Sequence, residues 1–535
     1  MPTPEVQLFS NGHYHLFVSS AGGGQSRWRD LALTRWREDA TRDCWGTFIY
    51  LRDTASGEFW SAGYQPALRS SEDYEATFTE AKAEFRQRRG DLEIGMQIWV
   101  SPEDDVEVRR LTLTNHSRGK RSIELTSYAE VVLAVPGADL AHPVFSNLFV
   151  QTEFLRDRGA ILCTRRPRSE AEERPWLLHL MAAHGGGELS CETDRNRFIG
   201  RGRTAADPAA MLEVSPLSNT VGSVLDPIVS LRRNFVLAPD ETLQVGFVLG
   251  ATESRDAALA LIERYQKLSV IDQSFELANN HGETILHLLG PTETELYARL
   301  ASALVYLNPA QRADPAVLIQ NRRGPNGLWS QGISGNVPII LLRISDTNKI
   351  EIAKQLIQAH SYWRAKALAV DLIILIEDDS ESEQLLHNEV ISLVAQGPEP
   401  SALDKPSGIF VRQAKQVPAE DRTLLLATAR IVLTDRDGTL TEQLNRQENP
   451  GPPVEDLEAP QPVPRDPSSS LARPLAARDE SPYVSDVTRR SGTDRATSQE
   501  LVFHNGLGGF TPDGREYVIT LQPEQATPAP WVNVI

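Results

Sequence analysis

Cysteine is scarce in this sequence of 535 residues. Its three cysteines, Cys44, Cys163 and Cys191, lie far apart and form no CxxC pair, which argues against both a zinc–thiolate site and a disulfide framework. The 11 histidines contain no His–x3–His pair, and the acidic run 377–383 is interpreted as a solvated loop rather than a cation site. The sequence therefore predicts no metal site and no cofactor.

Long apolar runs and an excess of basic residues are also missing. The longest apolar runs, such as 368–376, reach about half of the ~20 residues that a membrane helix needs, and residues 1–17 lack the basic and apolar regions of a signal peptide. Lys and Arg number 54 against 72 Asp and Glu, which gives a net charge of −18. Because such a surface repels phosphate groups, we expect no nucleic-acid partner and no membrane insertion. A reducing, cytoplasmic compartment fits these absences.

The first 250 residues carry the alternating pattern of β-strands. Apolar side chains occupy one side of the run 123–133, and Glu124 and Glu130 fall on the other side. The run 243–249 repeats this pattern. In 106–113 the apolar phase shifts by one residue, which indicates either a bulge or a strand that is covered on both faces. Many such strands, separated by turn residues, predict a large antiparallel sandwich.

The periodicity becomes helical after residue 250 and then alternates between strand and helix. Apolar residues at helical spacing between 258 and 307 predict two or more helices. The elements expected beyond them are a strand at 338–344, a helix at 350–367, a strand at 370–376, a helix at 384–395, a short strand at 408–412, and a helix or helix plus strand at 420–433. This alternation predicts a small α/β unit with a partly parallel sheet.

Composition changes once more near the end of the sequence. Nine prolines lie between residues 450 and 482, with almost no large apolar side chains, and this composition predicts a disordered linker. We therefore expect five regions, namely the β-sandwich at 1–270, a helical linker at 271–336, the small α/β unit at 337–441, the disordered linker at 442–500 and an ordered tail at 501–535 that contains one hairpin.

Several motifs in register carry a resemblance to a known family. They are AGGGQSRWRD at 21–30, TRWR at 34–37, GTFIYLRD at 46–53, FWS at 59–61, RRLTLTN at 109–115, FSNLFVQT at 145–152 and GISG at 332–335. These motifs resemble the β-supersandwich region of glycoside hydrolase family 94, formerly glycosyltransferase family 36. Over about 1–440 and 500–535 the sequence is similar to the C-terminal half of bacterial cyclic β-1,2-glucan synthases. The resemblance implies a carbohydrate-associated β-supersandwich at 1–270.

The tail extends this resemblance. Its segments 514–520 and 528–533 resemble the opening strands of a family-94 catalytic module, here a truncated second sandwich. In the family, that sandwich precedes an (α/α)6 barrel that carries the catalytic aspartate and the phosphate-binding residues. The printed sequence ends before such a barrel. We therefore assign no catalytic residue and expect no activity from this chain alone.

An aromatic–arginine–carboxylate cluster is the candidate carbohydrate-binding site. Its members are Trp28, Arg29, Asp30, Trp36, Arg37, Trp45, Tyr50, Arg52, Asp53, Trp60 and Tyr64. Aromatic faces stack on the apolar face of a pyranose, and arginine and aspartate bond its hydroxyls. A second interpretation is a sandwich core in which Arg–Asp pairs hold the loops. Both interpretations stay open at this point.

A second motif, Asp435-Arg-Asp437-Gly-Thr, resembles the DxDGT motif of haloacid-dehalogenase phosphatases, in which the first Asp is the nucleophile and the second a general acid. Those enzymes need further parallel strands after the motif, whereas here the proline-rich segment follows. We interpret Asp435 and Asp437 as a turn that ends a helix. Phosphatase activity is an alternative.

The sequence thus favours the carbohydrate-binding, non-catalytic portion of a cyclic β-1,2-glucan synthase or related glycoside phosphorylase. A β-glucan or glucooligosaccharide is the expected ligand. An alternative is a subunit or fragment of an active glycosyltransferase or phosphorylase that a companion chain completes. We expect the protein in the cytoplasm, at the inner-membrane face if it associates with a full synthase.

Overall fold

The structure is a computed structural model, and it describes most of the chain. The described residues are 4–39, 41–69, 71, 73–167, 174–213, 215–377, 383–448, 501–503, 507–513 and 515–521. The chain divides into two compact units, 1–451 and 452–535.

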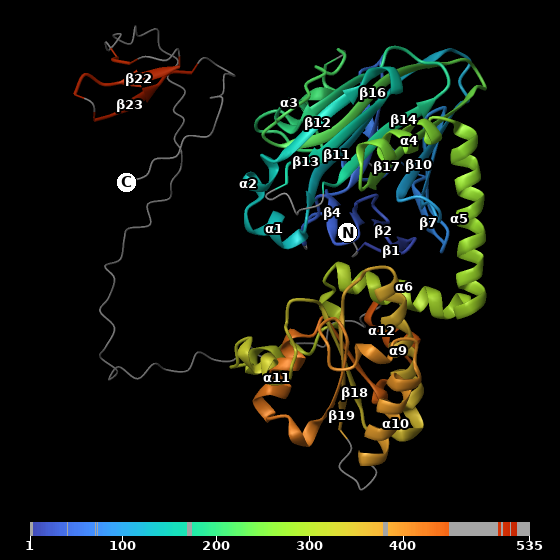
Figure 1. Ribbon diagram of the computed structural model, residues 1–535, viewed down its shortest axis with the longest axis vertical. Coiled ribbons are helices and arrows are strands. Elements are labelled where there is room, and N and C mark those ends of the chain that lie inside the picture. Colours follow the sequence, from blue (N-terminus) through green and yellow to red (C-terminus); the bar gives the residue numbers. More distant parts are fainter. Residues whose placement is uncertain are drawn as a thin grey trace. The chain divides into compact units, whose positions relative to one another are not determined.

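The first unit begins with two large antiparallel sheets that form a sandwich (Figure 1). In the first sheet the order is β1-β2-β3-β4-β11-β16-β15, and β5 pairs with β11 and with β6. These strands are β1 (Val6–Ser10), β2 (Tyr14–Ser19), β3 (Gly24–Trp28), β4 (Leu31–Thr34), β5 (Thr47–Asp53), β6 (Phe59–Ser61), β11 (Arg121–Ala134), β15 (Ser190–Asp194) and β16 (Pro227–Leu237).

The second sheet has eight strands in the order β12-β13-β14-β17-β10-β9-β8-β7. They are β12 (Val150–Leu155), β13 (Ala160–Arg165), β14 (Trp176–Ala183), β17 (Thr242–Thr252), β10 (Val106–Asn115), β9 (Leu92–Val100), β8 (Ala83–Arg89) and β7 (Glu75–Phe78). The predicted antiparallel sandwich is therefore confirmed. The turn at 238–241 carries the chain from β16 in one sheet to β17 in the other.

Strand β10 is covered on both faces, which settles the alternatives that its sequence left open. Its pairing with β9 and with β17 runs without a break, so the strand contains no bulge. Val106 and Val108 pack toward the helices α4 (Arg255–Tyr265) and α5 (Leu268–Leu289). Leu111 and Leu113 pack in the core between the sheets. The phase shift in the sequence marks the point where apolar burial changes from one face to the other.

Strand β11 is also buried on both faces, although its sequence alternates between apolar and polar residues. Glu124 and Glu130 are each 7% exposed. Burial of a carboxylate is costly unless a cation pairs with it. Glu124 lies 2.7 Å from the guanidinium of Arg52 and 3.3 Å from that of Arg232, on the neighbouring strands β5 and β16. The polar side of the strand therefore faces a layer of ion pairs rather than water.

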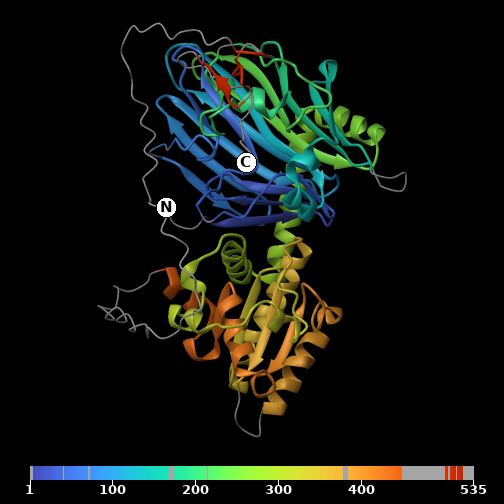
Figure 2. The same cartoon turned by 90° about the vertical axis from the view of Figure 1, so that its left-hand side faces the viewer.

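Helices follow the sandwich, and a four-stranded sheet follows the helices. The helices are α6 (Pro291–Val305), α7 (Pro315–Gln320) and α8 (Asn326–Trp329). The sheet order is β20-β19-β18-β21, and all neighbouring pairs are parallel, so the sheet is fully rather than partly parallel. Its strands and helices are β18 (Ile339–Ile344), α9 (Ile350–Ala365), β19 (Asp371–Ile376), α10 (Glu383–Gln396), β20 (Ile409–Gln413), α11 (Ala419–Thr428), β21 (Ile431–Thr434) and α12 (Leu440–Glu448). Figure 2 shows this sheet with helices on both sides.

One predicted boundary is wrong. The linker was expected to begin at residue 442, but α12 continues to Glu448. The helix starts with a capping box: the Thr439 hydroxyl accepts the backbone N–H of Glu442, and the Glu442 carboxylate accepts the backbone N–H of Thr439. Leu440 and Leu444 are buried in the core of the α/β part. The cap and these two leucines extend the ordered chain to the end of α12. The remaining predicted linker, 449–500, lies outside the described residues.

At two points, buried polar contacts join the sandwich to the helices and the α/β part. The Lys366 ammonium lies 2.6 Å from Glu80, which precedes β8, and donates at 2.8 Å to the carbonyl oxygen of Leu8 in β1. The hydroxyl of Tyr362 also donates to Glu80, at 2.7 Å. At a second point, the hydroxyl of Tyr306 at the end of α6 donates to Asp43 in the loop before β5.

The described residues of the second unit form one hairpin. Strand β22 (Gly508–Phe510) pairs antiparallel with β23 (Tyr517–Ile519), as the turn residues between them predicted. The segment 528–533, which resembles a family-94 opening strand, lies outside the described residues.

Candidate functional site

Four of the eleven predicted sugar-binding residues lie in the core of the sandwich. They are Trp28, Tyr50, Arg52 and Trp60, and each is at most 2% exposed. The indole N–H of Trp28 donates to Asp105 at 2.7 Å, and the Tyr50 hydroxyl donates to the carbonyl oxygen of Ala205 at 2.6 Å. These four residues match the second interpretation of the cluster, in which buried aromatic and arginine residues stabilise the sandwich.

Asp53 has a local structural role at the end of β5. Its carboxylate accepts the backbone N–H groups of Ala55 and Ser56 and pairs with Arg121 at 2.5 Å. Burial would raise the pKa of Asp53, but these three donors outweigh burial, so the pKa lies below its usual value. Asp53 therefore fixes the turn between β5 and β6.

The other six cluster residues reach the surface in separate places. Arg29 lies over the Trp28 ring and pairs with Glu253 of the strand–helix loop, and Asp30 is exposed beside it. Arg37 lies 5.9 Å from the centroid of the Trp45 ring. Trp36 and Tyr64 are half-buried. The eleven residues therefore do not form one surface, and sugar contact by members of the cluster stays a prediction.

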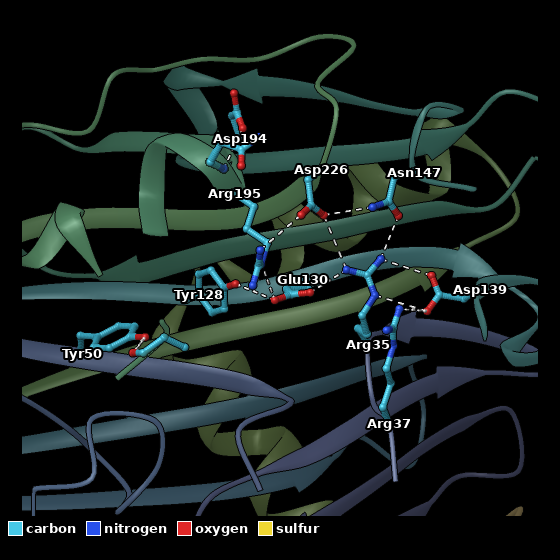
Figure 3. Close-up of polar contacts among 12 residues, drawn as sticks. Arg35, Arg37, Tyr50, Tyr128, Glu130, Asp139, Asn147, Asp194, Arg195 and Asp226 are labelled. Atoms are coloured by element: carbon cyan, nitrogen blue, oxygen red, sulfur yellow. Dashed lines mark hydrogen bonds and ion pairs between the residues drawn. The ribbon is translucent and has the colours of Figure 1, made fainter. Parts of the chain in front are cut away.

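Arg35, which sequence reasoning did not single out, is the centre of a buried ion network (Figure 3). It follows β4 and donates to Glu130 of β11 at 2.6 Å. It also donates at 3.2–3.3 Å to Asp139 of α1 (Pro136–Ala141) and at 2.8 Å to Asn147 of α2 (Pro143–Asn147). A single guanidinium thus ties the two short helices to the first sheet.

Glu130 receives donors from more than one side. Figure 3 shows Arg35 and Arg195 approaching it from opposite sides, and Arg195 donates at 2.7 Å from α3 (Arg195–Ile199). The Tyr128 hydroxyl donates at 2.9 Å. Burial alone would raise the pKa of Glu130, but the charges of Arg195 and Arg35 lower it below its usual value. Burial and the charge of Glu130 raise the pKa of the neighbouring Asp226. The donors around Glu130 make it an anchor for the loops and not a free acid or base.

A cleft of about 1030 Å³ opens on the other side of the chain segment that carries Arg35. Strands β2 and β3 line one side of it, and residues 321–339 line another. Ile339, Ala369 and Arg430 place it beside the amino-terminal ends of β18, β19 and β21. The cleft therefore lies where the first sheet, the helices and the parallel sheet come together.

Two tryptophans supply aromatic surface to this cleft. Trp36, one of the predicted sugar-binding residues, packs edge-on against Phe17 with ring centroids 5.4 Å apart and against Tyr306 at 6.4 Å. Trp329 at the end of α8 is 61% exposed, and its indole N–H donates at 3.3 Å to the carbonyl oxygen of Ser334. The sequence analysis missed Trp329, because it is a lone aromatic residue in a short helix.

Polar groups line the same cleft. Gln25 of β3, Asn321 and Asn336 offer amide donors and acceptors, and all three are half-buried or exposed. His15 of β2 also lines it, and burial followed by the charge of Arg27 lowers its pKa to about 4. His15 is therefore neutral at pH 7 and can both donate and accept.

The predicted phosphatase motif lies at the other end of the parallel sheet, where the strands have their carboxyl-terminal ends. Asp435 follows the strand β21, and not a helix as expected, because α11 ends at Thr428 and β21 lies between. Its carboxylate accepts the backbone N–H groups of Ser345 at 2.6 Å and Asp346 at 2.8 Å, just after β18. The strand order reverses between β18 and β21, and in open parallel sheets ligands bind at the carboxyl ends of the strands at such a switch point. Here the protein's own carboxylate already occupies these donors, so the geometry gives the phosphatase alternative no support.

In the described part of the chain, no group of three or more His, Cys, Asp or Glu side chains could hold a metal ion. Within it as well, every helix is too short or too polar to cross a bilayer.

Known proteins resemble this chain in sequence. The model of the glycosyl hydrolase 94 supersandwich domain matches residues 1–268. Cyclic β-(1,2)-glucan synthase NdvB of Rhizobium meliloti (strain 1021) is 34% identical over 536 residues, which cover 99% of this chain and 18% of NdvB. Solabiose phosphorylase of Paenibacillus borealis is 26% identical over 43% of this chain and 29% of its own length.

Among solved structures, a bacterial glucoamylase complexed with acarbose matches with a TM-score of 0.33 and 8% identity, over 58% of this chain and 40% of the glucoamylase. The chain spans about a fifth of the length of NdvB and under a third of that of the phosphorylase. The family model nevertheless covers half of the chain, from the first strand through the whole sandwich. The chain therefore belongs to the family of proteins that carry a glycosyl hydrolase 94 supersandwich domain.

Proposed function

We propose that this chain is a carbohydrate-binding, non-catalytic portion of a protein of the cyclic β-1,2-glucan synthase or glycoside phosphorylase type. We further propose that it binds a β-glucan segment in the cleft beside Trp36. The observation that carries the proposal is this cleft of about 1030 Å³, which combines two tryptophans with neutral polar side chains. The relatives support the ligand class, because NdvB is named for a β-(1,2)-glucan and the Paenibacillus enzyme for the disaccharide solabiose.

The chemistry of the cleft suits a neutral oligosaccharide. A volume near 1000 Å³ is at the upper end of ordinary ligand sites, and thus has room for several sugar rings. The exposed ring of Trp329 can stack on the apolar face of a pyranose. Asn321, Asn336 and Gln25 can both donate to and accept from sugar hydroxyls.

The same lining supports binding rather than hydrolysis. Glycoside hydrolysis uses a pair of carboxyl groups on either side of the scissile bond. Glu38 is the one carboxylate among the described residues that line the cleft, and it pairs with Arg430 at 2.5 Å. A second carboxyl group to act with it is therefore missing from the described lining.

Titration with β-1,2-glucooligosaccharides tests the proposal. We expect tryptophan fluorescence and calorimetry to report a dissociation constant between about 100 μM and several millimolar, because an open, wet site gains little net free energy. Trp329→Ala removes a largely exposed ring and should weaken binding about five- to tenfold without loss of stability. Trp36→Phe keeps an aromatic ring in its packed position and should weaken binding less.

A matched control is available on α2. Phe145 is 58% exposed and does not line the cleft, so Phe145→Ala should leave the affinity unchanged. No binding at tens of millimolar oligosaccharide would contradict the proposal. Equal affinities of the wild-type protein and Trp329→Ala would show that any binding occurs elsewhere.

A further inference from the structure

Arg27 is a charged residue of the cleft that binding of a neutral sugar leaves unexplained. It lies on β3, opposite His15 of β2, and it lines the cleft half-buried. Its Nε atom is buried and has no hydrogen-bond partner within the described part of the chain. One Nη atom donates to the carbonyl oxygen of Ala367, at a long distance of 3.5 Å. Burial lowers the pKa of Arg27, and the charge of Asp30 offsets this only in part.

The other cations of the cleft are already paired. Arg430 pairs with Glu38, and Lys366 lies 2.6 Å from Glu80. Arg323 lies 3.0 Å from Glu420 and 3.3 Å from Asp421. Arg27 differs, because no carboxylate of the described chain lies within 4.0 Å of its guanidinium.

The charge of the cleft differs in sign from that of the chain. Among the described residues that line it, four are cationic (Arg27, Arg323, Lys366 and Arg430), and Glu38 supplies the one carboxylate. The whole chain nevertheless carries a net charge of −18. A half-buried guanidinium without an ion-pair partner is costly, and a planar guanidinium fits carboxylate or phosphate oxygens through two parallel bonds.

We propose that the saccharide bound in this cleft carries an anionic group, a carboxylate or a phosphate, and that Arg27 binds that group. This inference rests on the proposed function, since it concerns the same cleft. The two tryptophans then contact the sugar rings, while Arg27 selects charged saccharides over neutral ones. Arg27 thereby sets specificity and is distinct from the groups that bind the rings.

Three matched probes test the inference. They are the β-1,2-linked trisaccharide sophorotriose, the same trisaccharide with a C6 carboxylate on its non-reducing sugar, and the same trisaccharide with a 6-phosphate there. Calorimetry with the full chain should show at least one charged probe binding about tenfold more tightly than the neutral one. The better of the two charged probes identifies the group that the cleft accommodates. The preference should fall to about threefold or less in 0.5 M NaCl, because salt screens charge interactions near the surface.

Substitution of Arg27 links the preference to this residue. Arg27→Gln should reduce the charged-to-neutral affinity ratio to about one, and it should fold, because it removes a charge that lacks a partner. Arg27→Lys keeps the charge without the planar fork and should retain part of the ratio. Arg343→Gln makes the same change of charge outside the cleft, where Arg343 pairs with Glu377, and should leave the ratio unchanged.

The failures of the two proposals are distinguishable. If all three trisaccharides bind equally, or if the preference survives Arg27→Gln, the inference about Arg27 is wrong and the proposed function stands. If none of the three binds, the proposed function fails as well. Inorganic phosphate that binds as tightly as the phosphorylated trisaccharide would also overturn the inference, because Arg27 would then bind a free anion without regard to the sugar.

Discussion

Arg35 and Trp36 are adjacent in the sequence, and their side chains lie on opposite sides of the chain segment. The guanidinium of Arg35 lies 2.6 Å from Glu130 in the buried ion network, whereas the Trp36 ring packs against Phe17 and lines the cleft. The alternation continues, since Arg37 reaches toward Asp139 and Glu38 lines the cleft. Successive side chains of an extended segment point to opposite sides. The sequence TRWRE thus places ion-network residues and cleft residues in turn, and the network fixes the segment from which Trp36 extends.

Arg35→Met should be among the most destabilising single substitutions in the sandwich. The Arg35 side chain is 5% exposed, and its removal leaves Asp139 and Asn147 without their buried donor and Glu130 with one cation fewer. The loss of one partner of a buried ion pair costs about 3–5 kcal/mol. We expect urea unfolding to report a loss of that size.

Arg37→Met is the matched control for this prediction. Its side chain is 38% exposed and lies 4.0 Å from Asp139, so its loss should cost less than about 1 kcal/mol. Similar losses for the two variants would show that the network does not hold the loops.

Asp43 should make stability depend on pH between about 4 and 6. Burial raises the pKa of Asp43 to about 6, and hydrogen bonds from Ser19 and Tyr306 reduce the increase only in part. Because the folded chain binds this proton more tightly than the unfolded chain, the contribution is favourable at low pH and is lost as pH rises through 6. The difference amounts to about 3 kcal/mol at most for this group.

Asp43→Asn isolates that contribution. The asparagine side chain cannot ionise. The unfolding free energy of the variant minus that of the wild-type protein should therefore increase as pH rises from 4 to 7. Chemical unfolding at several pH values measures the difference. A difference that stays constant across this range would show that Asp43 titrates normally in the folded protein.

The fold could be predicted well from the sequence because its elements rest on local periodicity. The alternating run 123–133 lies in β11, and the helical stripe of Ala258, Ile262 and Tyr265 is buried on α4. The alternation of strands and helices after 337 likewise predicted β18, β19 and β20 to within one residue, whereas the sequence left open whether the strand β21 follows the helix α11. Propensity and apolar spacing act over neighbouring residues, and a sequence displays both directly.

The site was harder to predict, because its groups come from distant parts of the chain. Glu130 meets Arg35 and Arg195 only through the pairing of strands and the packing of α3. Tryptophans that are close together in the sequence separate for the same reason: Trp28 and Trp60 enter the core, whereas Trp36 lines the cleft. An alternating sequence shows that two faces exist, but not which of them meets water. Burial of the polar face of β11 could not be read from its residues alone.

The contact of Lys366 with Glu80 should hold the sandwich and the α/β part together. Both side chains are almost fully buried, and the ammonium lies 2.6 Å from the carboxylate. Burial lowers the pKa of Lys366, while the charge of Glu80 raises it. Lys366→Met leaves Glu80 buried with only the donors of Tyr362 and Gln7, and should cost about 3–5 kcal/mol.

A double-mutant cycle separates this pair from its surroundings. Glu80→Gln in the Lys366→Met background removes the unpaired charge and should recover part of the loss. We expect a coupling free energy of about 1–3 kcal/mol from unfolding measurements. Additive effects of the two substitutions would mean that the contact contributes little to the packing of the two parts.

The capping box of α12 leads to a local prediction. Thr439→Ala removes the hydroxyl that accepts the Glu442 N–H, and loss of such a cap costs about 1 kcal/mol. Because α12 is the last helix among the described residues of the first unit, this loss should open the helix locally rather than unfold the whole unit. Hydrogen exchange of the amides at 443–448 should therefore become about fivefold faster, with little change in β18.

Thr441→Ala is the matched control. Thr441 is exposed and lies two residues after the cap residue Thr439, and alanine favours the helix. If Thr439→Ala and Thr441→Ala exchange at the same rate, the burial of Leu440 and Leu444 alone holds α12, and the cap contributes nothing measurable.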